Sequence, residues 1–101
     1  MDELLIMVLQ SSNRMKEVFI KKYWEEGDAT FYLHFKDGEP IRQIESTREG
    51  VFLTTMESPF DGDSMLYDQS LSDLKLEDGD TILKSEFEEA WNKYDLLDKR
   101  R

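Results

Sequence analysis

Apolar and polar residues alternate through the first half of the chain after residue 15, and this pattern predicts a series of β-strands. The alternation is clearest in residues 30–36, where Phe31, Leu33 and Phe35 fall on one side. A period of two that is rich in aromatic and β-branched residues is typical of half-buried strands. We expect four such strands, at residues 16–24, 30–36, 40–47 and 51–57.

The connections between these strands are short, and they predict an antiparallel meander. Asp37-Gly38 indicates a two-residue hairpin turn, because a type I′ turn needs positive φ at both positions. Residues 48–50 predict a three-residue hairpin loop with its glycine in the left-handed conformation. Ile41 and Ile44 fall on opposite sides of the third strand, which indicates a bulge or a strand that is apolar on both sides.

The last part of the chain carries a helical pattern. Ser85 and Glu88 match the capping box S-x-x-E, so we expect a helix over about residues 86–98. Its apolar stripe recurs at helical spacing and consists of Phe87, Ala90, Trp91, Tyr94 and Leu97. We expect the aromatic residues of this stripe to pack on the sheet against Phe31, Leu33 and Phe35.

The predicted fold class is therefore α+β, an antiparallel β-meander of about four strands with a C-terminal α-helix packed on one face. A chain of 101 residues is one domain, expected at residues 15–98. Residues 1–14 are expected to be an N-terminal extension or a short element that covers the sheet, and residues 99–101 a basic tail. The apolar run at residues 4–9 is too short to span a bilayer and lacks the flanks of a signal peptide, so we expect a cytoplasmic protein.

Charge is concentrated in one segment. Residues 57–80 hold eight acidic residues against one lysine, a net charge of −7 in a chain whose total is −10. Residues 58–80, which we call the acidic arm, have no sustained period and are expected to be mostly irregular, with a short helix near 69–75. Four scattered apolar residues of the arm can pin it to the domain: Leu66, Leu71, Leu74 and Leu76.

The residues that could act in catalysis do not favour an enzyme. The chain has no cysteine, and its single histidine, His34, is expected to have a surface or cross-strand role. The acidic pairs 25–26 and 88–89 are explained by a loop and a helix N-terminus. Arg42 and Glu45 are interpreted as an exposed ion pair or part of a binding face, and we assign them a structural role and no function. No nucleophile–base combination remains, and we expect a non-enzymatic protein without a cofactor.

A dedicated metal site is also disfavoured. One histidine without cysteine cannot form a zinc site. An EF-hand loop that starts at Asp61 would need Asp or Asn at its fifth position, glycine at its sixth and glutamate at its twelfth, but these are Met65, Leu66 and Ser72. Weak cation binding by the arm stays open, and we expect no metal ion as a resident cofactor.

Two stretches of the chain resemble a known group of proteins. These are F-Y-L-H-F-K-D-G-E-P-I-R-Q-I-E at residues 31–45 and I-L-K-S-E-F-E-E-A-W-N at residues 82–92. The strand pair ending in R-x-I-E and the helix with F-E-x-x-W are similar to small acidic bacterial domains that include immunity proteins of polymorphic toxin and contact-dependent inhibition systems. This resemblance covers about residues 15–95 and implies neutralisation of a toxin domain.

An acidic surface fits such a role, because nuclease toxins are basic and an acidic inhibitor can occupy the places of the phosphates. The expected partner-binding residues are Asp61, Asp63, Tyr67, Asp68, Asp73, Glu77, Asp78 and Asp80, with Tyr67 as an exposed aromatic anchor. Two alternative functions stay open: a nucleic-acid mimic that inhibits a DNA- or RNA-binding protein, and a domain whose charge serves solubility alone. A homodimer formed through an edge strand is compatible with each of these functions. Direct binding of nucleic acid or of an anionic membrane is disfavoured by the same charge.

Overall fold

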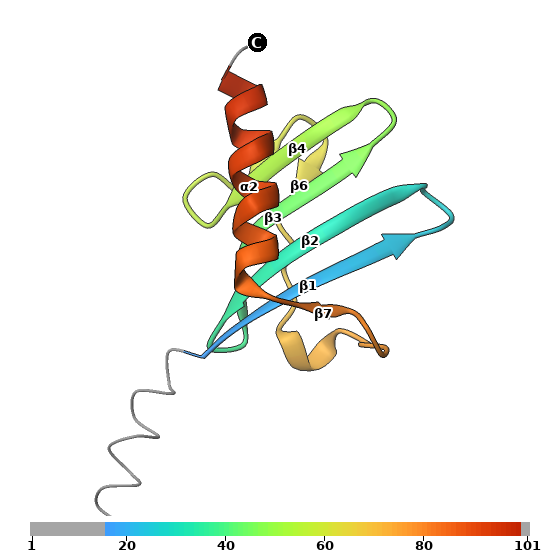
Figure 1. Ribbon diagram of the computed structural model, residues 1–101, viewed down its shortest axis with the longest axis vertical. Helices are drawn as coiled ribbons and strands as arrows, with labels where there is room; N and C mark the ends of the chain where they lie inside the picture. Colours follow the sequence, from blue (N-terminus) through green and yellow to red (C-terminus); the bar gives the residue numbers. More distant parts are fainter. Residues whose placement is uncertain (1–15, 100–101) are drawn as a thin grey trace, which may run out of the picture.

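A five-stranded antiparallel sheet with the strand order β4-β3-β2-β1-β7 forms the framework of the computed structural model, which describes residues 16–99 (Figure 1). Its strands are β1 Glu17–Trp24, β2 Ala29–Lys36, β3 Glu39–Thr47, β4 Gly50–Thr55 and β7 Thr81–Ile82. The helix α2, Lys84–Lys99, packs on one face of the sheet. The predicted fold class is confirmed.

The turns follow the chemistry of their residues. Asp37 and Gly38 have φ of 53° and 87°, as the predicted type I′ turn requires. The register of β2 and β3 shifts between His34 and Phe35 and leaves Ile41 unpaired, which confirms the predicted bulge. Gly50 has positive φ but already belongs to β4, so this loop is one residue shorter than predicted.

The start of the helix differs from the prediction. α2 begins at Lys84, and the backbone amides of Glu86 and Phe87 both donate to the carbonyl of Leu83 at 3.1 Å. Ser85 thus lies inside the first turn, so the predicted capping box is wrong.

The sheet buries apolar side chains on both faces. On the helix face, Phe19, Ile44 and Phe87 are buried together, and Ala90, Trp91 and Tyr94 pack against them. On the opposite face, a second buried cluster consists of Ile20, Leu33 and Phe35.

The predicted packing partners of the helix are therefore wrong. The aromatic residues of α2 contact the Phe19 and Ile44 side of the sheet, whereas Leu33 and Phe35 face the other way. Both sides of β2 carry large side chains, so alternation alone did not identify the side that the helix covers. We call the two sides the helix face and the arm face.

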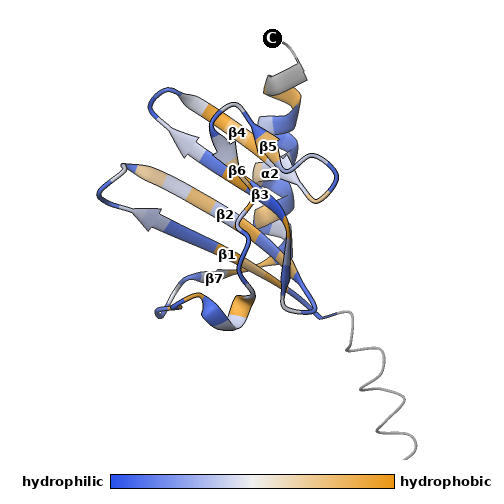
Figure 2. Cartoon of the chain, turned by 180° about the vertical axis from the view of Figure 1, so that it is seen from behind, coloured by the Kyte–Doolittle hydropathy of each residue, from blue (hydrophilic) through white to orange (hydrophobic). Residues whose placement is uncertain are grey.

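The acidic arm covers the arm face, as the view from behind shows (Figure 2). It contains a small hairpin of β5 Phe60–Asp61 and β6 Ser64–Met65, followed by a 3₁₀ turn at Leu71–Asp73 that confirms the predicted short helix. Leu66 is buried, and Leu71 and Leu74 pack against the Ile20–Phe35 cluster. Leu76 is exposed, so three of the four predicted pinning residues make contact.

The expected N-terminal extension, residues 1–14, and the last two residues of the basic tail lie outside the described residues. Within residues 16–99, no helix is both long and apolar enough to cross a membrane.

Candidate protein-binding surface

The predicted partner-binding acids do not form one cluster. Asp61 and Asp63 belong to the β5–β6 hairpin, which lies beside β4 at one end of the sheet. Asp78 and Asp80 lie at the other end, where the backbone carbonyl of Asp80 accepts a hydrogen bond from the amide of Lys21 at 2.8 Å. The acids therefore follow the arm across the whole arm face.

Two of these acids have structural contacts. One carboxylate oxygen of Asp61 accepts a hydrogen bond from the amide of Leu53 at 2.9 Å, on the outer edge of β4. The carboxylate of Asp80 accepts from Lys22 Nζ at 2.7 Å and from the amide of Glu77 at 2.8 Å. The hydrogen bond from Lys22, then that from Glu77, lowers the pKa of Asp80 below its ordinary value. The side chains of Asp61 and Asp80 therefore hold the arm against the sheet.

The other acids of the predicted set are exposed, and they are Asp63, Asp68, Asp73, Glu77 and Asp78. Their side-chain hydrogen bonds are local, such as those from Gln69 to Asp68 at 3.1 Å and from Ser70 to Asp73 at 3.1 Å. Such contacts within the arm leave these carboxylates facing solvent.

Tyr67 is part of the packed structure and not the exposed anchor that was expected. Its ring lies edge-on to Phe35 with 6.1 Å between the ring centroids, and its backbone amide donates to Gln43 Oε1 at 2.8 Å. Burial raises the pKa of Tyr67, and the charges of Asp73 and Asp68 raise it further. Tyr67 is therefore packed against the sheet, and the surface beside its ring is the part that is open to a ligand.

That surface contains an apolar hollow of about 400 Å³ between the sheet and the arm. Most of its lining is apolar: Trp24, Phe31, Leu33, Met65, Leu66, Tyr67 and Leu74, with Tyr23 also contributing. Gln43 is a buried polar residue in this lining, and both ends of its amide are satisfied, by the carbonyl of Met65 at 3.0 Å and by the amide of Tyr67. Lys22 and Asp68 complete the lining.

A second hollow of about 320 Å³ adjoins the first. Met65, Leu66, Tyr67 and Asp68 line both hollows, so this stretch of the arm is a shared wall. The rest of the second lining comes from Glu39, Pro40, Met56, Pro59 and Phe60. Met56 and Phe60 are 59% and 65% exposed, so apolar surface extends along this part of the arm face.

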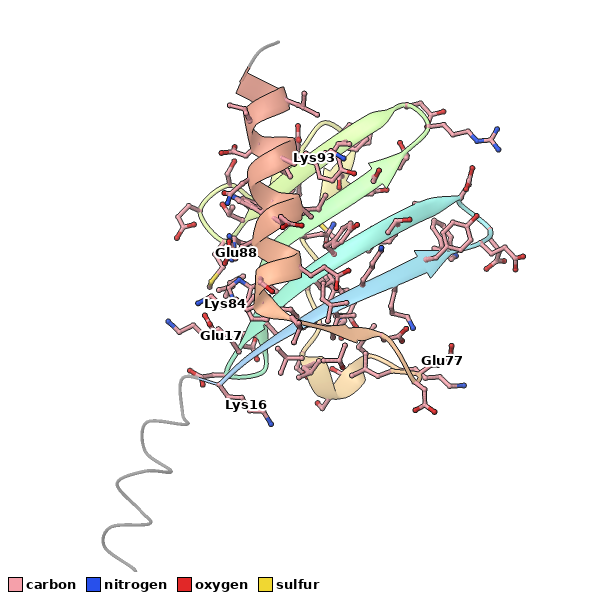
Figure 3. All side chains as sticks on the ribbon, in the orientation of Figure 1. Lys16, Glu17, Glu77, Lys84, Glu88 and Lys93 are labelled. Atoms are coloured by element: carbon pink, nitrogen blue, oxygen red, sulfur yellow. The ribbon has the colours of Figure 1, made fainter. Side chains whose placement is uncertain are left out.

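On the helix face, the structure joins residues that the sequence did not connect. Arg42 donates from Nε to His34 Nδ1 at 2.9 Å, and its two terminal nitrogens bind both carboxylate oxygens of Glu88 at 3.2 and 2.6 Å. Glu17 lies within 3.2 Å of His34 Nε2 and 3.7 Å of Lys84 Nζ. Figure 3 shows Glu17 and Lys84 beside each other, with Glu88 higher along the helix.

His34 is 4% exposed, so the expected surface position is wrong, whereas the cross-strand role is confirmed by its contacts with β1 and β3. Its ring stacks on Phe19 with 4.3 Å between centroids. Burial, followed by the charge of Arg42, lowers the pKa of His34. The hydrogen bonds from Arg42 lower the pKa of Glu88.

The interpretation of Arg42 and Glu45 as an ion pair is wrong. The two residues are three positions apart on a strand and lie on opposite faces, because the side chain of Glu45 accepts a hydrogen bond from Ser64 of the arm at 2.6 Å. Each of these side chains instead ties β3 to the element that covers its face.

Residues 16–99 contain no group of three His, Asp or Glu side chains that could hold a metal ion. Comparison of the chain with protein-family models, with curated proteins and with solved structures finds no match. The functional argument therefore rests on the arm face itself.

Proposed function

We propose that this chain is a non-enzymatic binding protein that holds a basic protein partner on its arm face, in the manner of an immunity protein that neutralises a nuclease-type toxin. One observation carries the proposal: the same arm supplies five exposed carboxylates and much of the lining of two apolar hollows. Protein interfaces combine these two elements, a desolvated apolar anchor and a polar rim.

The two elements have separate effects on binding. Exposed acids steer a basic partner and raise its association rate, and salt weakens this effect. Burial of apolar side chains acts only at short range, once the two proteins are in contact. It therefore slows dissociation and has little effect on the association rate. An inhibitor of a phosphate-binding protein benefits from both, since its carboxylates occupy the surface on which the phosphates would bind.

A second candidate function is inhibition of a DNA- or RNA-binding protein by mimicry of nucleic acid. The observation that favours it is the spread of the exposed acids, since Asp63 lies beside β4 and Asp78 lies beside β1. Mimicry predicts acids spaced over a long surface, whereas the apolar hollows favour a specific protein interface.

The experiment is capture of partners from a lysate of the source organism at low salt, with three baits of matched design. The first is the native chain. The second carries Asp63→Asn, Asp68→Asn, Asp73→Asn and Asp78→Asn, which spares the structural Asp61 and Asp80. The third removes the same amount of charge at exposed positions off the arm, through Glu25→Gln, Glu49→Gln, Glu86→Gln and Glu89→Gln.

We expect one basic protein to be captured by the native chain and the third bait but not by the second, and the purified pair to show loss of the partner's activity. Equal loss of capture with both variant baits would mean that the charge of the arm serves solubility alone. Capture of many nucleic-acid-binding proteins, all released by added DNA or RNA, would support the mimic instead.

A further inference from the structure

The larger apolar hollow has the properties of an anchor site. We infer that it receives one aromatic or large aliphatic side chain of the partner, and that Lys or Arg residues flank this side chain in the partner's sequence. This inference rests on the proposed function and adds to it the position and the chemistry of the contact. Binding energy at protein interfaces concentrates on a few side chains that fill such pockets.

The walls of the hollow determine what it accepts. Trp24 and Met65 are 52% and 49% exposed and can make new contacts, while Leu33 is 4% exposed and belongs to the buried core. Both the nitrogen and the oxygen of the Gln43 amide already have a hydrogen-bond partner in the arm backbone, so an apolar group that enters leaves neither atom without one. A volume of about 400 Å³ lies within the range of ligand pockets, so the hollow has room for one large side chain.

The charges around the hollow determine what flanks that side chain. Asp68 lines the hollow and is exposed, and the arm that borders it is strongly acidic. Lys22, the base in the lining, is neutralised by Asp80, whose carboxylate oxygen lies 2.7 Å from its ammonium group. The electrostatic potential at the opening of the hollow is therefore negative. It favours a cationic segment of a partner and disfavours an anionic amphiphile such as a fatty acid.

The test uses the full chain labelled with ¹⁵N and three synthetic peptides. These are acetyl-Lys-Arg-Phe-Arg-Lys-amide, its counterpart with Ala in place of Phe, and its counterpart with Glu in place of every Lys and Arg. Amide chemical shifts are followed by NMR during titration at low salt. We expect the Phe peptide to bind about tenfold more tightly than the Ala peptide, because a benzyl group leaves water. The largest shifts should be those of the Gln43 side-chain amide and the Tyr67 backbone amide.

Two substitutions in the exposed wall, Met65→Ala and Trp24→Ala, should each reduce the preference for Phe over Ala. Both residues are half exposed, and the ¹⁵N spectrum of each variant reports directly whether it is folded. Leu83→Ala is the matched control, because Leu83 is 72% exposed and lies outside the hollow. The preference should be unchanged in this control.

The outcomes separate the inference from the proposed function. Equal, salt-sensitive binding of both peptides that is lost in the four-site arm variant would overturn the anchor and leave the acidic binding surface standing. Equal binding of a Phe peptide with Glu flanks would overturn the basic context of the anchor. Absence of binding by either basic peptide would overturn both the anchor and the charge-based function.

Discussion

Arg42 on β3 and Glu88 on α2 form a two-pronged ion pair across the helix face, 46 residues apart in the chain. The guanidinium of Arg42 also lies 4.8 and 5.0 Å from the ring centroids of Phe87 and Trp91, and it donates a third hydrogen bond to His34. One side chain thus links β2, β3 and α2, and it fixes the position of the helix on the sheet.

Arg42→Ala should lower the free energy of unfolding by about 2–3 kcal/mol, because it leaves His34 and Glu88 without their shared donor in a partly buried site. Urea unfolding measures this change. Arg48→Ala is the control, since Arg48 pairs with Asp28 at 2.6 Å but is 85% exposed, and it should cost less than about 0.5 kcal/mol. A similar cost for both substitutions would contradict the linking role of Arg42.

The stability of the protein should depend on the protonation of His34. Arg42 can only donate, so Nδ1 of His34 accepts and the ring proton lies on Nε2, directed at Glu17. The groups that face the ring are Glu17 of β1, Arg42 of β3 and Glu88 of α2; their combined effect with burial is a lowered pKa.

In the unfolded chain His34 takes up a proton near its ordinary pKa of about 6.5, whereas the folded chain takes it up only at lower pH. The unfolded state then binds more protons, so this contribution to stability is present above about pH 6.5 and is lost as the pH falls below it. Urea midpoints between about pH 7.5 and about pH 5.5 should decline more steeply for the native chain than for His34→Gln. Parallel pH profiles would contradict this expectation.

Thr54 offers a site for stabilisation. Its side chain is fully buried, and its hydroxyl has no hydrogen-bond partner within the described part of the chain. Thr54→Val removes this hydroxyl while keeping the shape, and it should raise the free energy of unfolding by about 1 kcal/mol.

Thr55→Val is the matched comparison, because the hydroxyl of Thr55 accepts a hydrogen bond from the amide of Ser58 at 3.0 Å. This substitution should lower the free energy of unfolding by about 0.5–1 kcal/mol. Opposite signs at neighbouring threonines in the same urea series would support the assignment, and a loss of stability in both variants would refute it.

The mouth of the larger hollow depends on a glycine. A Cβ at Gly27 would collide with the ring of Trp24, so Gly27→Ala should displace this ring and shift tryptophan fluorescence. Trp24 is half exposed and can move, so the loss of stability should be small. Gly38→Ala is the control: with φ of 87° and nothing near its Cβ, it should cost about 1 kcal/mol and leave the fluorescence unchanged.

Local patterns were enough to predict the hairpins, the bulge and the helix, because each depends on residues close together in the chain. The turn at Asp37-Gly38 and the bulge at Ile41 are examples. The strand β7 was missed, since two residues are too short to show an alternation. The helix start was misplaced because Ser85 matches a capping motif that the structure does not use.

The features of the candidate site were harder to predict, since they depend on contacts between distant residues. The choice of face for α2 is decided by the whole packing, and the pairing of Arg42 with Glu88 joins residues far apart in the chain. The acids were found from composition, but the hollow beside them was not. It is formed only when Trp24, Leu33 and the arm come together.

Phe19 and Ile20 are neighbours in β1, yet they belong to different apolar clusters separated by the backbone of the sheet. Side chains on one face therefore contribute to stability almost independently of those on the other. Exposed positions of the arm face can therefore be substituted without disturbing the packing of α2 on the helix face. The surface proposed for binding can thus change in sequence while the packing between α2 and the sheet stays the same.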